Sequence, residues 1–330
     1  MTHPVVVYVP HPGVGDLMWH LPFIRALAEH RCDDAITLLT RRTTQAKLLL
    51  ADEPHIYTVE YVPYVSGPLC HLRELFLTLK TLRRLQPRSL WILDKISRPA
   101  IAARILGIQD VFGFGLGSQR RWVCKPALNP DLKDIHQIDK LTAYFELQQI
   151  PVASTEPSLI INPEAINKQQ MRFNDKPKPW IMLGVGARNQ IRRWPNVFYR
   201  NLIERFNGAG TWFVLGGLNE FELVEREIVP HTTNPNVVNI SRLNIAEAAA
   251  LISCCNLFIG NDSGPMNIAA ALGIATIGLF GATAPLRYSK HIRPLTSPAN
   301  NRRMAAITVE EVSDLATRLG VFDKGPDRFL

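Results

Sequence analysis

The amino-acid sequence predicts an α/β protein with two successive doubly wound domains. Its 330 residues favour two domains at roughly 150 residues each. Short β-branched runs alternate with segments of helical spacing, and this alternation is typical of a parallel sheet covered by helices. With 46% hydrophobic and 20% charged residues, the composition is close to the globular average and excludes a disordered, collagenous or disulfide-scaffold protein.

The first alternating series begins at Val5. A β-branched run over residues 5–9 predicts a strand, and the turn HPGVGD leads into a helix predicted over residues 17–30. In the helix predicted over residues 69–85, the arginines lie opposite an apolar face that comprises Leu72, Leu75, Phe76, Leu79 and Leu82. The other elements expected in this series are strands at 35–40, 57–62 and 89–93 and helices at 43–51 and 99–106.

A proline-rich, irregular segment at residues 151–179 separates this series from a second one. The expected divisions are an N-terminal Rossmann-like domain (1–155), a linker (156–179), a C-terminal Rossmann-like domain (180–308) and a closing helix (309–330). The uncharged stretch from Ser263 to Leu286 is interrupted by prolines and glycines, which predicts a buried helix, turn and strand rather than a membrane span. The second series has strands expected at 180–183, 211–215, 237–239, 257–259 and 275–280 and helices at 195–207, 219–229 and 245–253.

Basic residues are concentrated in the N-terminal half. The chain has 37 Lys and Arg against 29 Asp and Glu, a net charge of +8, and residues 66–125 alone hold eleven basic and three acidic side chains. This region predicts an anionic partner, such as a phosphorylated lipid, a membrane surface or a nucleic acid; the alternative is a solvated surface without a partner. Five cysteines without a C-x-x-C motif and an N-terminus without a signal-peptide pattern predict a reducing, cytoplasmic compartment.

Three glycine-containing loops carry the candidate chemistry. The first, PHPGVGD, has Asp16 at a helix start, where it is either a helix N-cap or a functional carboxylate. A dinucleotide fingerprint needs a third glycine, and Met18 stands there instead, which disfavours an oxidoreductase. The second loop, GVGARNQIRRWP, has Arg188, Arg192 and Arg193 before a helix, which suits a phosphate; the alternative is a set of ordinary exposed arginines.

The third loop, GNDSGPMNIAAALG, is the most specific. Asp262, Ser263 and Gly264 follow a predicted strand, Pro265 suits the first helical position, and Gly273 suits the helix end. A helix N-terminus contributes only about 0.3 to 1 kcal/mol to anion binding, so it needs help from the arginines. The sequence has no H-E-x-x-H and no D-x-D motif, which predicts that protein groups, not a metal, neutralise a bound diphosphate.

Together, four segments resemble glycosyltransferase family 9, the bacterial lipopolysaccharide heptosyltransferases. They are GDLMWHLPFIRAL, RRWPNVFYRNLIERF, LGGLNE and IGNDSGPMNIAAALGIATIGLFGAT, and they extend over nearly the whole chain. The resemblance implies a GT-B fold, in which two Rossmann-like domains face each other across a cleft. It implies that the C-terminal domain binds a nucleotide sugar, typically ADP-heptose, and that the N-terminal domain receives the lipid A and Kdo inner core.

The resemblance also implies roles for individual residues. Asp16 matches the family's general base, Arg192 its diphosphate-binding lysine and Glu220 its ribose-binding acid. The remaining residues placed by the resemblance are those of the donor site (Gly186, Arg188, Asp262, Ser263, Gly264 and Asn267) and those of the acceptor site (Gly15 and His20). Many members have Lys and His where Arg192 and Asn267 stand, so this chain departs from the family pattern at two donor positions.

The function expected from these observations is an inverting, metal-independent transfer of a heptose from ADP-heptose to the lipopolysaccharide inner core. No cofactor is expected beyond the nucleotide-sugar donor, and the expected partners are this donor, an anionic glycolipid acceptor and, transiently, the inner membrane, but no nucleic acid. Two alternatives stay open. One is a GT-B transferase that uses a UDP- or GDP-sugar, and the other is a catalytically silent nucleotide-sugar or glycolipid-binding protein.

Overall fold

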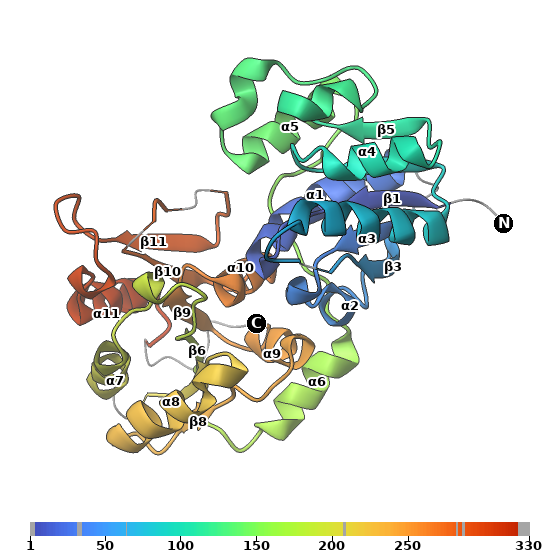
Figure 1. Cartoon of the computed structure of the whole chain (residues 1–330). Helices are drawn as coiled ribbons and strands as arrows, with labels where there is room; N and C mark the ends of the chain where they lie inside the picture. The colour runs from blue at the N-terminus through green and yellow to red at the C-terminus, as the bar shows by residue number, and fades with distance from the viewer. Residues whose placement is uncertain are drawn as a thin grey trace. The chain divides into compact units, whose positions relative to one another are not determined.

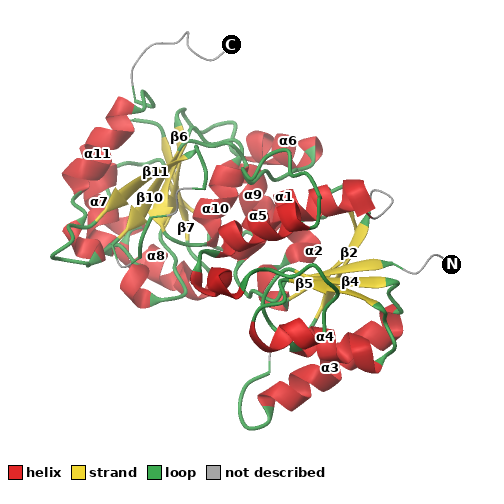
Figure 2. Cartoon of the chain, turned by 90° about the horizontal axis from the view of Figure 1, so that it is seen from above, coloured by secondary structure: helices red, strands yellow, loops and turns green. Residues whose placement is uncertain are grey.

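The computed structural model describes residues 4–31, 35–63, 65–206, 209–281, 283–285 and 288–322 (Figure 1). The chain divides into two compact units, Met1–Pro157 and Ser158–Leu330. Each unit has one parallel sheet with helices on both faces (Figure 2). The parallel α/β architecture that the alternation of elements predicted is therefore confirmed.

The sheet of the N-terminal unit has the strand order β3-β2-β1-β4-β5, and all its pairs are parallel. The four residues of β1 are completely buried, as expected for a central β-branched strand covered on both faces. Helices α3 and α4 cover one face and α1 and α5 the other (Figure 2). The strands are β1 (Val5–Tyr8), β2 (Ile36–Thr40), β3 (Ile56–Tyr61), β4 (Ser89–Ile92) and β5 (Asp110–Gly113), and the helices are α1 (Val14–Arg31), α2 (Ala46–Leu49), α3 (Cys70–Leu85), α4 (Arg98–Ile105) and α5 (Gln137–Leu147).

The sheet of the C-terminal unit has the order β11-β10-β9-β6-β7-β8 and is also parallel throughout. In both sheets the order reverses beside the first strand of the unit, between β1 and β4 and between β6 and β9. Ligands bind at the carboxyl ends of strands at such switch points. The strands are β6 (Trp180–Gly184), β7 (Thr211–Leu215), β8 (Val237–Asn239), β9 (Leu257–Asn261), β10 (Thr276–Phe280) and β11 (Ile292–Thr296), and the helices are α6 (Pro163–Arg172), α7 (Asn196–Arg205), α8 (Phe221–Glu227), α9 (Ile245–Ile252), α10 (Gly264–Ala271) and α11 (Val309–Arg318).

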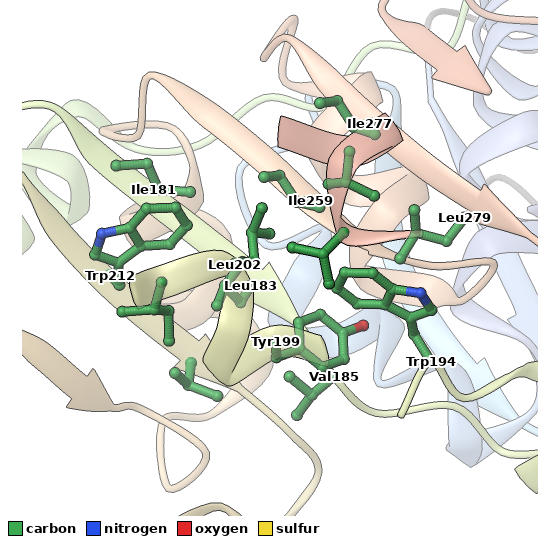
Figure 3. Close-up of a cluster of buried hydrophobic side chains, with 14 of the residues drawn as sticks. Ile181, Leu183, Val185, Trp194, Tyr199, Leu202, Trp212, Ile259, Ile277 and Leu279 are labelled. Atoms are coloured by element: carbon green, nitrogen blue, oxygen red, sulfur yellow. The ribbon is translucent and has the colours of Figure 1, made fainter. Parts of the chain in front are cut away.

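The core of the C-terminal unit holds the loops of the switch point in place. Side chains of β6, β7, β9 and β10 pack there against helices α7 and α11, and Trp194 and Tyr199 lie within this cluster (Figure 3). The backbones of β6 and β9 also approach closely, because Gly184 and Gly260 pair across them. A Cβ atom on Gly260 would lie 2.7 Å from the carbonyl oxygen of Gly184, so only glycine fits there without a shift of the strands.

Helix α3 buries part of the apolar face that the sequence suggested: Leu82 is buried, and Leu75 and Leu79 pack against the core of the unit. Glu74, Thr78 and Leu82 are buried, whereas Leu72 and Phe76, which belong to the predicted apolar face, are exposed. The reason is electrostatic: Glu74 forms ion pairs with Arg41, which is buried, and with Arg98 at 2.8 Å. These pairs draw the acidic side of the helix inward.

Several elements differ from the predicted ones. The helix expected at 43–51 is reduced to the four residues of α2, because Gln45 adopts a left-handed backbone conformation with φ of 51°. Strands β5 and β11 and helices α5 and α6 were not predicted, and α6 lies inside the segment expected to be a linker. Of the expected closing region 309–330, α11 covers Val309–Arg318, and residues 323–330 lie outside the described residues. Among the described helices, none combines the length and the apolar character needed to span a membrane.

Candidate active site

The loops after β6 and β9 are joined at the switch point of the C-terminal sheet by Asn261. This side chain is completely buried; its Oδ1 accepts hydrogen bonds from the backbone N–H of Trp194 (2.9 Å) and the hydroxyl of Tyr199 (3.2 Å). Its Nδ2 donates to the carbonyl of Val185 at 2.9 Å. Asn261 therefore fixes the arginine-rich loop relative to Asp262, and sequence reasoning gave it no role.

Arg192 and Asp262, predicted as neighbours on the donor phosphate, contact each other directly. The Nη1 of Arg192 lies 3.0 Å from Oδ2 of Asp262, and the hydroxyl of Thr283 donates to the same oxygen at 2.8 Å. Asp262 is therefore partly neutralised and held in place, while the Arg192 side chain stays 40% exposed. The pair joins residues seventy positions apart in sequence.

Two polar atoms beside this pair are buried without a hydrogen-bond partner in the described part of the chain. They are Nε of Arg192 and Oγ of Ser263. Ser263 is the N-cap residue of α10, yet its side chain makes no capping hydrogen bond, and Gly264 begins the helix. The amide of Asn267 donates to the carbonyl of Ser263 at 3.0 Å, so it stabilises the first turn from within. A guanidinium, a hydroxyl and a helix N-terminus are thus close together, which is an arrangement that suits an anion.

Glu220 is bound by its own turn and by Arg193. Its carboxylate accepts hydrogen bonds from the backbone N–H of Gly217 (2.7 Å) and from Nη2 of Arg193 (2.6 Å). The Nε of Arg193 also donates to the carbonyl of Ala187. Arg193 therefore ties the arginine-rich loop to the turn that carries Glu220. The sequence placed Arg193 on a phosphate loop, and in the structure its guanidinium is engaged in this contact.

The other predicted residues of this loop, Gly186 and Arg188, lie in its first part, shortly after β6. A Cβ on Gly186 would stand 3.4 Å from the backbone nitrogen of Gly217, so Gly186 packs against the same turn as Glu220. Arg188 is exposed. The predicted donor residues are therefore assembled at one edge of the C-terminal sheet, and their contact with a donor stays a prediction.

In the N-terminal unit, Asp16 lies in the first turn of α1 and is not its N-cap. The helix begins at Val14, two residues before Asp16, so Gly15 is also helical. The Oδ2 atom of Asp16 would lie 2.4 Å from a Cβ on Gly13, so the carboxylate folds back over the Cα of that glycine. This places the carboxylate at the loop that follows β1, at the switch point of the sheet.

His20, predicted at the acceptor site, is buried in the structure and contacts backbone carbonyls. It is only 1% exposed; its Nδ1 lies 2.6 Å from the carbonyl oxygen of Asp16, and its Nε2 lies 3.4 Å from that of Leu93. Burial and the charge of His11 lower the pKa of His20 to about 4, against the opposing effect of its backbone hydrogen bonds. His20 is therefore a neutral residue that holds the backbone of Asp16.

His11 and Asp94 form a second charged pair at the same sheet edge. The Nε2 of His11 lies 3.0 Å from Oδ2 of Asp94, and the rings of His11 and His20 are 5.5 Å apart. Burial lowers the pKa of His11, but the hydrogen bond and charge of Asp94, with the charge of Asp16, outweigh it and raise the pKa above 6.5. Neither residue of the pair was predicted, since they come together only through the pairing of β1 with β4.

We expect the two histidines to titrate apart. In a histidine-resolved NMR titration, His11 should titrate above pH 6.5 and His20 near pH 4. Because its folded-state pKa is raised, His11 stabilises the protein fully below pH 6.5, and this contribution is lost as the pH rises through the raised value. Asp94→Asn should lower the pKa of His11, because burial then acts with less opposition. Asp110→Asn, a change at an exposed carboxylate, should leave it unchanged, and an unshifted His11 in Asp94→Asn would contradict the assignment.

The described residues contain no group of three or more His, Cys, Asp or Glu side chains arranged to hold a metal ion. The charged groups of both units are instead arranged as cation–carboxylate pairs: His11 with Asp94, Arg192 with Asp262 and Arg193 with Glu220.

Two parallel doubly wound units make up the GT-B fold, which the chain shares with solved heptosyltransferase structures. The chain belongs to glycosyltransferase family 9, described as heptosyltransferase, because the family model matches residues 95–314, more than half of its length. The matched range includes every predicted donor residue but not Asp16. The predicted family, fold class and enzyme class are confirmed.

Individual relatives agree with this family. Lipooligosaccharide heptosyltransferase 2 of Haemophilus influenzae is 30% identical over 174 residues. The match covers 48% of this chain and 49% of that relative, so the chain spans about half the length of the relative. Lipopolysaccharide core heptosyltransferase OpsX of the same species is 24% identical over 91% of this chain and 83% of its own. The solved structure of the Escherichia coli ADP-heptose heptosyltransferase II has a TM-score of 0.77 at 19% identity, and the match covers 97% of this chain and 98% of that one.

Proposed function

We propose that this protein is an inverting glycosyltransferase that moves a heptose from ADP-heptose to the lipopolysaccharide inner core. Family membership supports heptose transfer in general. The donor is proposed from the similar Escherichia coli protein, whose structure is described as an ADP-heptose heptosyltransferase. The acceptor is proposed from the relatives, which are described as lipopolysaccharide and lipooligosaccharide heptosyltransferases.

The observation that carries the proposal is the pair of unpartnered polar atoms at the start of α10. Nε of Arg192 and Oγ of Ser263 are buried beside a helix N-terminus, and a diphosphate oxygen would supply the acceptor atom that both lack. The helix N-terminus contributes up to about 2 kcal/mol to binding an anion when it is partly buried. Since enzymes lower barriers by about 8 kcal/mol or more, the guanidinium of Arg192, with that of Arg188, must supply much of the leaving-group stabilisation.

In the proposed reaction, Asp16 is the general base. Its carboxylate takes the proton of the acceptor hydroxyl while that oxygen forms a bond to the anomeric carbon of the heptose. The bond from the anomeric carbon to the diphosphate breaks at the same time, and its electron pair leaves with ADP. One displacement of this kind inverts the anomeric configuration. Glu220, fixed by Arg193, is proposed to contact the ribose of the donor.

The proposed reaction requires no metal, because cationic side chains balance the charge of the departing diphosphate. The proposed acceptor is the lipid A and Kdo core, and the proposed place of action is the cytoplasmic side of the inner membrane. Asn267 cannot carry a positive charge, and its amide is engaged with the backbone of Ser263. We therefore assign Asn267 to shaping the first turn of α10 rather than to direct stabilisation of the leaving group.

Thermal unfolding with different nucleotides tests the donor. We expect ADP to stabilise the protein, GDP, UDP and NAD to do so much less, and EDTA to change nothing. At a nucleotide concentration of 100 times the Kd, the stabilisation is about 2.7 kcal/mol. Preference for UDP or GDP would favour a different nucleotide sugar, and preference for NAD would reject a transferase.

A variant of Arg192 tests whether ADP binds at the proposed phosphate site. Arg192→Ala should weaken ADP binding by about tenfold or more, because a charge-assisted hydrogen bond is lost. Arg205→Ala removes a similarly exposed arginine that pairs with Glu310 on the protein surface, and it should leave ADP affinity unchanged. Equal ADP affinity in wild type and Arg192→Ala would remove Arg192 from the phosphate site.

A further inference from the structure

Helix α3 presents to solvent a stripe that mixes apolar and basic side chains. We define this α3 stripe by its six exposed residues: Leu69, Leu72, Arg73, Phe76, Lys80 and Arg83. Leu69 is the N-cap residue; at 3.6 residues per turn the other five fall within an arc of about 100°, directly opposite the buried Glu74, Thr78 and Leu82. The stripe is thus one continuous surface, not a set of scattered side chains.

The apolar part of the stripe is unusually exposed for its size. Leu69, Leu72 and Phe76 are 66%, 62% and 66% exposed, and they follow one another at spacings of three and four residues. Two of them belong to the face that the sequence pattern assigned to the protein interior. Glu74 lies inward with its ion pairs to Arg41 and Arg98, and Leu72 and Phe76 lie outward, so their exposure is built into the packing of α3. Large apolar side chains gathered on one surface mark a site of interaction.

The basic part of the stripe has no acidic partner in the described chain. Among the described residues, no carboxylate forms an ion pair with Arg73, Lys80 or Arg83. Other basic groups of the 66–125 region are engaged within their own unit: Arg84 binds Glu60, and Arg104 donates to backbone carbonyls. The stripe therefore combines exposed apolar side chains with three basic side chains that no acidic group of the described chain neutralises.

We propose that the α3 stripe docks this protein on a membrane surface rich in anionic phospholipid, with the apolar side chains inserted at the acyl boundary and the basic ones at the headgroups. Binding of this kind combines apolar burial with attraction to anionic lipid. A second copy of the chain is a poorer occupant, because a two-fold contact would bring Arg73, Lys80 and Arg83 against their own equivalents. The inference rests on the proposed function only in that a lipid-linked acceptor explains why docking is useful.

Vesicle flotation with the full chain tests this proposal. We expect binding to vesicles of phosphatidylethanolamine and phosphatidylglycerol, weak binding to vesicles of phosphatidylcholine alone, and weakening by salt. The double variant Leu72→Ser/Phe76→Ser and the double variant Arg73→Glu/Lys80→Glu should each reduce binding by about tenfold or more. Met171→Ser changes an equally exposed apolar side chain on α6 and should leave binding unchanged.

Two further measurements distinguish a failure of the proposed membrane docking from a failure of the proposed donor site. ADP should stabilise the wild type and both stripe variants to the same extent. A variant that binds ADP normally but no longer binds vesicles has therefore lost only the docking function of the stripe. The proposal is overturned if the wild type ignores anionic vesicles, binds neutral ones equally well, or binds no better than the stripe variants. It is also overturned if sedimentation shows a dimer that the stripe variants dissociate, since the stripe would then be a contact between copies. Failure of ADP to bind the wild type would instead count against the proposed donor site.

Discussion

Asp16→Asn is expected to lower kcat by about 10²- to 10⁴-fold and to leave ADP affinity unchanged. An amide of the same shape cannot accept the proton of the acceptor hydroxyl, and general-base catalysis is worth about that factor. The substitution keeps the local structure, because His20 binds the backbone carbonyl of Asp16 and not its carboxylate. The measurements are initial rates with saturating donor, ADP binding by calorimetry, and thermal unfolding.

A purely structural role of Asp16 predicts a different result for Asp16→Asn. A carboxylate in the first turn stabilises a helix by about 0.3 to 1 kcal/mol, so a purely structural role predicts a small loss of stability and normal turnover. Glu164→Gln is a matched control, because Glu164 lies in the first turn of α6 and faces the same helix dipole effect. Near-normal kcat in Asp16→Asn would show that Asp16 stabilises the helix and is not the general base.

Asn261→Leu is expected to lower the free energy of unfolding by about 2 to 6 kcal/mol and to weaken ADP binding. Leucine has a similar size, but it leaves the backbone N–H of Trp194 and the carbonyl of Val185 buried without a partner, at about 1 to 3 kcal/mol each. The hydroxyl of Tyr199 also loses a hydrogen bond to Asn261, but this costs less stability because the hydroxyl still contacts the carbonyl of Gly184. Chemical denaturation gives the change in stability, and calorimetry gives the Kd for ADP.

A matched control separates loss of stability from loss of the site. Asn256→Leu removes a side-chain acceptor from the backbone N–H of Trp180, at the opposite end of β6. It should lower stability without changing ADP affinity, because it leaves both loops of the switch point intact. Should Asn261→Leu prove too unstable, Asn261→Asp keeps the acceptor for Trp194 but replaces the donor to Val185 with a buried carboxyl oxygen. ADP binding unaffected in either Asn261 variant would show that Asn261 does not organise the donor site.

The local features of the fold were predictable, and the exceptions have physical causes. Buried central strands such as β1 and β7 are continuous apolar runs, so their positions follow from the sequence alone. Strand β11 carries Arg293 and Pro294, and β5 begins with the exposed Asp110; both are edge strands, so neither is a continuous apolar run. On α3 the apolar periodicity placed Leu75, Leu79 and Leu82 on the inward side as they are found, but not Glu74, which lies inward through ion pairs with Arg41 and Arg98.

The sequence by itself determined the two alternating series, the three glycine-containing loops and the family, because hydrophobic periodicity, turn residues and motifs are properties of neighbouring positions. Only the tertiary structure decided which charged side chains meet. The pairing of β6 with β9 brings Asn261 to Trp194 and Asp262 to Arg192, and the pairing of β1 with β4 brings Asp94 to His11. Such contacts join residues that are tens of positions apart, so they depend on the order of strands in a sheet, which no local pattern encodes.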